Sequence, residues 1–357
     1  MKKSQWILGL AVLIALVALG VYAQHEHPFH WHTFVEQLAL ADWRKIAYAL
    51  GCIYLCYLIR SARWALLLRH NRKVPLLSLL GTQVMGFTAV ALLGRVAEPV
   101  RPYLVARKTG LLFSGQVAVY LVERLLDAGS MVLIFSSVIL LAPAGALPHA
   151  DVMKKVSYGA LTTTVAGALF LIAVRLAGEM VASFLEGLFG LVSKTLGHAV
   201  AHKVRAFRAG LDTMRSFSDF AAVFALSLAM WGLISLAYLE ITTAFVHCPQ
   251  LAALTLPKCM VLMASSLAVS GFQLPVLGWF SQIGVVAAAL SGFFGVAAEP
   301  ATACAASLLL VGFLAVVPIG LVWAHFEHVS LRKVTVESER AGEQLAGEDA
   351  TGQDAAL

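Results

Sequence analysis

The amino-acid sequence predicts an all-α polytopic integral membrane protein, and composition is the first observation that supports this fold class. The chain has 357 residues, of which 60% are hydrophobic and only 13% are charged, and its mean hydropathy is +0.82. A soluble globular protein has roughly 25% charged residues. Because about half of that charge is missing, a soluble core could not bury the apolar side chains.

The distribution of the charged residues is the second observation. Seven stretches contain no Asp, Glu, Lys or Arg, namely residues 4–25, 74–94, 128–150, 156–174, 220–239, 259–298 and 300–326. A helix that crosses the hydrocarbon core of a bilayer needs about 20 apolar residues. The sequence therefore predicts a polytopic membrane domain over residues 1–326.

The first predicted helix covers Trp6–Tyr22 and runs outward from the two N-terminal lysines. An alternative is a secretory signal peptide, because the Val-Tyr-Ala sequence at 21–23 resembles a cleavage site. The apolar run is longer than in a typical signal, so we predict a retained anchor. A second helix, from about Ile46, returns to the inside at the basic residues that begin with Arg60.

The next elements alternate in the same way. Helices over Gln116–Leu141 and Val156–Val174 enclose an external loop, and the segment 175–219 lies inside. Apolar residues alternate with Arg, Lys and His in this segment, which predicts amphipathic helices on an anionic membrane surface rather than nucleic-acid binding. Most of the 26 Lys and Arg residues then lie inside, so the positive-inside rule predicts cytoplasmic termini.

Two uncharged stretches do not fit a simple crossing. Residues 74–94 have basic flanks at both ends, which predicts a re-entrant hairpin broken near Gly81 and Gly86. A later uncharged stretch of 40 residues is interrupted by GFQLPVLGW (271–279), and its proline and glycines predict a second re-entrant element near 256–292. Broken elements at corresponding positions indicate two inverted halves with a substrate site between them. Ordinary kinked spans are the alternative.

The C-terminal tail, residues 327–357, has a different composition from the membrane domain. It carries seven acidic and three basic residues and few large apolar ones. Such a composition cannot bury enough apolar surface to fold by itself. We therefore predict an acidic, disordered cytoplasmic tail.

The sequence predicts no metal and no cofactor. HEHPFHWH (25–32) contains four His, but Pro28 prevents the helix that an HExxH zinc site needs. The five Cys form no CxxC pair and are typical of small packing residues. SKTLG (193–197) lacks the glycines of a phosphate-binding loop, so the chain shows no ATP-binding motif.

A dense group of ionisable residues lies close to the apolar spans: Glu98, Arg101, Glu123, Arg124 and Asp127. Ionisable groups at membrane depth are costly, so they usually contact a partner or a wet cavity. One interpretation is a set of ion pairs that joins helices. The other is a binding site for a charged lipid head group, and the two are compatible.

These residues stand in a recognisable pattern. GRVAEPVRPYLVARKTG (94–110) and YLVERLLDAG (120–129) resemble the signature of the lysylphosphatidylglycerol-synthase transmembrane-region family, which are flippase-like bacterial membrane proteins. The resemblance implies a protein of the bacterial inner membrane. The aminoacyl-transfer activity of this family belongs to a separate soluble domain. Only about 31 residues follow the last span here, fewer than the roughly 50 of a small domain, so we expect no enzyme.

The resemblance implies a lipid translocase that moves a polar or anionic lipid, possible substrates including a hopanoid-type or other cell-envelope lipid. Gln282 stands where the family usually carries an acid, so Glu98 is the remaining candidate for a proton-responsive gate. The residues expected to contact the lipid are Glu98, Arg101, Glu123, Arg124 and Asp127 in one half and Gln273, Ser281 and Gln282 in the other. The alternative is a non-catalytic accessory subunit for partner proteins of lipid or glycan biosynthesis.

Overall fold

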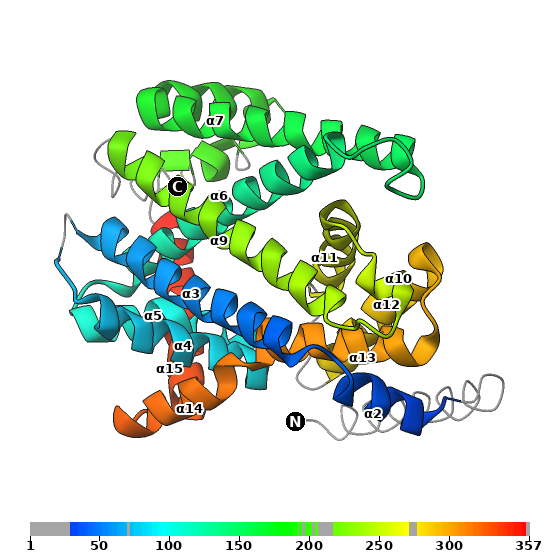
Figure 1. Cartoon of the computed structure of the whole chain (residues 1–357). Coiled ribbons are helices and arrows are strands. Elements are labelled where there is room, and N and C mark those ends of the chain that lie inside the picture. Colours follow the sequence, from blue (N-terminus) through cyan, green and yellow to red (C-terminus); the bar gives the residue numbers. More distant parts are fainter. Residues whose placement is uncertain are drawn as a thin grey trace, which may run out of the picture.

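All elements in the described part of the chain are helical, which confirms the predicted fold class (Figure 1). The computed structural model describes residues 29–69, 72–191, 193–194, 197–201, 204–205, 217–270 and 277–354. The predicted N-terminal helix and its signal-peptide alternative lie outside these residues. Four helices are long and apolar enough to cross a membrane, namely Trp43–Leu68, Leu76–Leu93, Ser218–Thr243 and Ala298–Phe326.

The helices α3 (Trp43–Leu68) and α9 (Phe217–Thr243) lie side by side and run antiparallel (Figure 1). At one end of the pair, Lys45 Nζ donates to Thr243 Oγ1 at 3.0 Å. At the other end, Arg69 forms an ion pair with Asp219. We call these the Lys45 end and the Arg69 end of the molecule.

After α3, the chain forms a helical hairpin that starts and finishes at the Arg69 end. Helix α4 (Leu76–Leu93) is followed by the short 3-10 helix η1 (Arg95–Ala97) and by α5 (Val100–Thr109). Arg72, just before α4, donates to the backbone oxygen of Thr109 at the end of α5. The hairpin of α4 and α5 thus returns to the end of the molecule at which it began, and its re-entrant position in the membrane stays a prediction.

The predicted break of this hairpin was placed wrongly. The helix α4 is continuous through Gly81 and Gly86, and the chain turns at Gly94, whose φ of 80° suits glycine. Gly81 and Gly86 instead allow close packing. A Cβ at Gly81 would lie 2.1 Å from Trp323 Nε1, and one at Gly86 would lie 2.3 Å from Arg101 Cγ.

A second helical hairpin follows α9, at the Lys45 end. After the single turn α10 (Pro249–Ala252), helices α11 (Leu256–Ser270) and α12 (Leu277–Phe294) pack against each other. Lys258 Nζ lies 5.8 Å from the centre of the Phe294 ring, so the hairpin starts and finishes at one end. Residues 271–276 of the predicted break, with Gln273 among them, lie outside the described residues, whereas Gly278 lies inside α12.

A long helix completes each half. In the first half this is α6 (Phe113–Leu140), and in the second it is α13 (Ala298–Leu309), the π-helix η2 (Leu310–Leu314) and α14 (Val316–Phe326). Helix α6 packs on α9 and α11, whereas α14 packs on α4. Because α3 and α9 are antiparallel and their hairpins enter from opposite ends, the halves are inverted relative to each other.

The helix α7 (Ala150–Gly190) connects the two halves and packs on α6. It has 41 residues and a non-helical Ala177 inside it, so the predicted segment 175–219 starts at a kink of this helix rather than as a separate element. Arg205 Nε donates to Glu179 Oε2 at 3.1 Å, which places the returning chain against α7.

The N-terminal helix of the described chain, α2 (Trp31–Ala39), packs on α13. The structure corrects the prediction of a disordered C-terminal tail. Residues Leu331–Asp354 of the tail form the helix α15. Its residue Val334 is buried in an apolar cluster with residues of α4, η1 and α5, and Tyr103 Oη donates to Glu337 Oε2 at 3.1 Å. The tail is polar overall, but these neighbours give it a surface to fold against.

Candidate functional site

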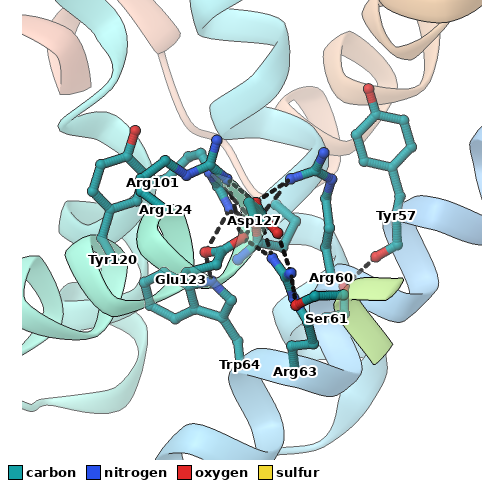
Figure 2. A network of polar contacts seen from close by, with 12 residues as sticks. Tyr57, Arg60, Ser61, Arg63, Trp64, Arg101, Tyr120, Glu123, Arg124 and Asp127 are labelled. Atoms are coloured by element: carbon teal, nitrogen blue, oxygen red, sulfur yellow. Dashed lines mark hydrogen bonds and ion pairs between the residues drawn. The ribbon is translucent and has the colours of Figure 1, made fainter. Parts of the chain in front are cut away.

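A buried carboxylate, Glu123 of α6, lies at the centre of a polar network (Figure 2). Its side chain is 0% exposed. Arg63 of α3 donates to Oε1 at 2.5 Å, and Arg101 of α5 lies 3.0 Å from both carboxylate oxygens. The indole Nε1 of Trp64 donates to Oε2. One carboxylate thus joins three helices of the first half.

Asp127, one turn further along α6, continues this network. It forms ion pairs with Arg63 and with Arg124, whose Nη2 lies 3.0 Å from Asp127 Oδ2. Arg63 also donates to Ser227 Oγ of α9 at 2.6 Å, which links the network to the second half. Buried charges are stable only when they are paired and hydrogen-bonded, and these carboxylates meet that condition.

Arg101 is held on several sides. It donates to Gln83 Oε1 from Nε at 3.1 Å and from Nη2 at 2.7 Å. Its Cζ atom lies 4.3 Å from the ring centre of Phe87 and 5.3 Å from that of Tyr120. Such cation–π contacts are strongest when the cation is desolvated. The absence of a side chain at Gly86 makes room for the stem of Arg101.

The network contains more arginines than carboxylates. Its cations are Arg60, Arg63, Arg101 and Arg124 and its anions are Glu123 and Asp127, which leaves two positive charges in excess. Arg60 is the least neutralised, because its Nη1 lies 3.8 Å from Glu123 Oε1 and 3.7 Å from Asp127 Oδ2. That atom has no hydrogen-bond partner among the described residues.

A cavity of about 250 Å³ lies next to Arg60, between the two halves. The first half contributes residues of α3 and of the turn between α4 and α5, and the second contributes residues of α9, α11, α12, α13 and η2. The polar and charged residues that line it are Tyr57, Arg60, Arg95, Glu98, Trp231, Tyr238, Ser266 and Gln282. The turn of the first hairpin and the helices α11 and α12 of the second hairpin therefore meet at one cavity.

Three buried polar atoms of cavity-lining residues have no hydrogen-bond partner in the described structure: Arg60 Nη1, Trp231 Nε1 and Gln282 Oε1. The Gln282 side chain is fixed by its amide nitrogen, which donates to Ser266 Oγ at 2.7 Å. Tyr238 Oη donates to the same hydroxyl at 3.3 Å. Because unpaired buried polar groups are rare in folded proteins, these atoms indicate a place for a polar ligand.

The structure places six of the eight predicted site residues in two groups. Glu98 and Gln282 line the cavity from opposite halves, and Tyr120 Oη donates to Glu98 Oε2 at 3.2 Å. The four others, Arg101, Glu123, Arg124 and Asp127, are together in the buried network beside it. Their predicted contact with a lipid stays a prediction. Ser281 is exposed and donates to Gly278 O.

Sequence reasoning missed Arg60 and Arg63. Both were placed among the basic residues that flank α3 on the inside, whereas α3 continues to Leu68 and buries them. Their spacing could have indicated burial, since two arginines three residues apart within an apolar helix lie on one face and need buried partners. Trp231 gave no signal, because a tryptophan in an apolar helix is ordinarily a packing residue.

The described residues contain no group of three or more His, Cys, Asp or Glu side chains that could hold a metal ion. In the predicted His-rich segment, His30 Nδ1 lies 3.0 Å from Glu299 Oε1, so this histidine joins α2 to the start of α13. His25 and His27 lie outside the described residues.

This arrangement defines a helical membrane protein of two inverted halves with a polar cavity between them. The family model described as the lysylphosphatidylglycerol synthase TM region matches residues 6–321, and the chain belongs to this family. The family suggested by the Gly94–Asp127 motifs is thus confirmed. Membership identifies a membrane protein of lipid-related function. No curated protein and no solved structure matches the chain.

Proposed function

We propose that this protein is a translocase that moves a polar lipid across the bacterial inner membrane. The observation that carries the proposal is the cavity lined by the turn of the first hairpin and by α11 and α12 of the oppositely oriented second hairpin. Inverted repeats with broken helices place substrate sites at that junction in membrane transporters. The proposal includes no enzymatic step and no ATP bound by this chain.

The free-energy barrier to moving a lipid lies in its head group. A polar group costs several kcal/mol to bring into hydrocarbon unless hydrogen-bond partners receive it. The cavity supplies charged groups from the first half, such as Arg60 and Glu98, and the amide of Gln282 from the second. The acyl or polycyclic part of the lipid stays in the bilayer during the transfer.

We propose that the Arg69 end of the molecule is cytoplasmic. Three contacts, between Arg69 and Asp219, Arg72 and Thr109, and Lys108 and Glu327, gather basic residues at this end. Basic residues are enriched on the cytoplasmic side of membrane proteins. The tail helix α15 follows Glu327 and is then cytoplasmic as well.

Transport by the purified protein in liposomes tests the proposal. The protein should accelerate the movement of labelled polar lipids between leaflets. Gly312→Phe places a ring at the cavity wall, where a Cβ meets no atom within 4 Å, and should abolish transport. Gly232→Phe is the matched control. A Cβ at Gly232 of α9 also meets no atom within 4 Å, and Gly232 is not among the cavity-lining residues described.

The alternative function, an accessory subunit for a lipid or glycan biosynthetic enzyme, gives a different result in this assay. The pure protein would then move no lipid, and Gly312→Phe would behave as Gly232→Phe. This result would overturn the translocase proposal.

A further inference from the structure

We infer that the cavity binds an anionic lipid head group, with a phosphate or carboxylate held between Arg60 of the first half and Trp231 of the second, and with a neighbouring hydroxyl group of the head group bound to Gln282. The inference rests on the proposed function and adds the substrate class to it. It depends on three features of the cavity: its charge, its unpaired hydrogen-bonding atoms and its size.

The charge around the cavity is positive on balance. The cavity-lining residues and the adjoining network together contain the cations Arg60, Arg63, Arg95, Arg101 and Arg124 and the anions Glu98, Glu123 and Asp127. The excess is two positive charges. The wall formed by the second half has no charged residue among those described, so it offers no carboxylate to balance Arg60. An anion supplies the missing charge.

The unpaired atoms match the same class of ligand. Arg60 Nη1 of α3 and Trp231 Nε1 of α9 are donors from the two halves, and neither the guanidinium nor the indole nitrogen can accept a hydrogen bond. An oxyanion accepts from both. Gln282 Oε1 is an acceptor, because its amide nitrogen is already bonded to Ser266. It suits a hydroxyl group next to the anion in the head group.

A head group without an anion fits less well. A cation would have only Glu98 as a cavity-lining carboxylate, and Glu98 already accepts from Tyr120 and lies 3.9 Å from Arg95 Nη1. The volume of about 250 Å³ is below the roughly 300–1,000 Å³ of pockets that enclose whole drug-sized ligands. The cavity therefore holds a head group and leaves the lipid tails outside.

Native mass spectrometry of the full-length protein in detergent tests the inference with four probes: phosphatidylglycerol, phosphatidylcholine, a cationic lipid and inorganic phosphate. Phosphatidylglycerol should bind at least about tenfold more tightly than the other lipids, as expected for charge-assisted hydrogen bonds in a buried site. Weaker binding of inorganic phosphate identifies a lipid as the source of the anion. Equal binding of phosphatidylglycerol and phosphatidylcholine overturns the inference.

Variants locate the binding to the cavity. Arg60→Gln should remove the preference for phosphatidylglycerol, whereas Arg107→Gln, which removes an exposed charge at the end of α5, should keep it. Equal losses in the two variants would indicate surface attraction and overturn the inference. If Arg60→Gln does not fold, Gln282→Glu and Trp231→Phe provide the test, because these residues of the second half line the cavity and are not members of the arginine network. Both variants should weaken the preference for phosphatidylglycerol, and an unchanged preference in both would overturn the inference.

The failure of this inference differs from the failure of the proposed function. Transport of lipids without any preference for anionic binding overturns the inference and supports the translocase. Preferential binding of phosphatidylglycerol without transport in liposomes overturns the translocase and supports the anion site.

Discussion

Glu123 and Glu98 are carboxylates of the same family motif with different environments. Glu123 is fully buried between Arg63, Arg101 and Trp64, whereas the Glu98 side chain is 39% exposed and lines the cavity. The first carboxylate holds helices of the first half together. The second carboxylate accepts a hydrogen bond from Tyr120 Oη at 3.2 Å and belongs to the cavity wall rather than to the buried network.

Stability measurements should separate these two roles. Glu123→Gln removes one anion from a buried network, and leaving buried cations unpaired typically costs about 3–5 kcal/mol. Glu98→Gln changes a partly exposed group and should cost less than about 1 kcal/mol. Chemical unfolding in detergent checks both. Equal destabilisation by the two variants would contradict the assignment of Glu98 to the cavity.

Transport measured under an imposed pH gradient tests the hypothesis that Glu98 is a proton-responsive gate. Wild-type proteoliposomes should respond to the gradient, and Glu98→Gln, which cannot change its charge, should respond no longer. Arg107→Gln serves as the control for a charge change outside the cavity. Wild-type transport that ignores the gradient would leave passive scrambling as the mechanism.

At the scale of helices, small residues determine how closely α4 packs on α14. A Cβ at Gly320 would lie 1.9 Å from Thr88 Oγ1 and 2.8 Å from the backbone oxygen of Val84. Close packing of this kind is a main source of helix association in membranes. The same contact includes the hydrogen bond from Thr88 Oγ1 to Val316 O, 3.2 Å long.

Gly320→Ala should therefore destabilise the protein by about 1–3 kcal/mol, the usual cost of overpacking. Gly232→Ala is the matched control, because its Cβ meets nothing within 4 Å and alanine favours helix by up to about 1 kcal/mol. Thermal unfolding in detergent measures the difference. If Gly320→Ala were as stable as Gly232→Ala, α4 and α14 would not be in close contact.

The tail helix α15 should depend on one buried side chain. Val334 is 2% exposed and Val336 is 42% exposed, so Val334→Asn places an amide in an apolar cluster and Val336→Asn does not. The first variant should release the tail to limited proteolysis, and the second should digest like the wild type. Identical digestion of all three proteins would contradict the packing of α15 on the first hairpin.

At the scale of the whole molecule, the ends of the helices define two opposite faces. Lys154 lies near the start of α7 and Arg205 lies in the segment after it. The proposed orientation places Lys154 outside and Arg205 in the cytoplasm.

Single cysteines in a Cys-free background test this orientation. The five native cysteines are buried, so their replacement removes no surface group. A membrane-impermeant thiol reagent added from the periplasmic side should label Lys154→Cys and not Arg205→Cys. The reverse pattern would invert the orientation, and labelling of both positions would contradict the topology.

Much of this architecture could be predicted from sequence because it depends on local composition. Three of the four helices long enough to cross a membrane coincide with uncharged stretches, and the hairpin follows from basic residues on both sides of 74–94. The exact turn could not be predicted, because Gly81, Gly86 and Gly94 look alike in sequence and only tertiary contacts distinguish them. Arg60 was missed for a similar reason, since its burial depends on carboxylates more than 60 residues away.

One further feature, the π-helix η2, determines how a single membrane helix contacts both hairpins. A π-turn accommodates an additional residue, so the helix that follows is rotated by about 100° relative to a regular α-helix. Before this turn α13 packs on α12, and after it α14 packs on α4. The additional residue in η2 thus sets the angle about the helix axis between the surface of α13 that contacts α12 and the surface of α14 that contacts α4. A deletion within Leu310–Leu314 would keep the span apolar and long enough, yet it would rotate α14 away from α4. The rotation of α14 about the helix axis, which a hydropathy profile does not show, is therefore necessary for the contact with α4.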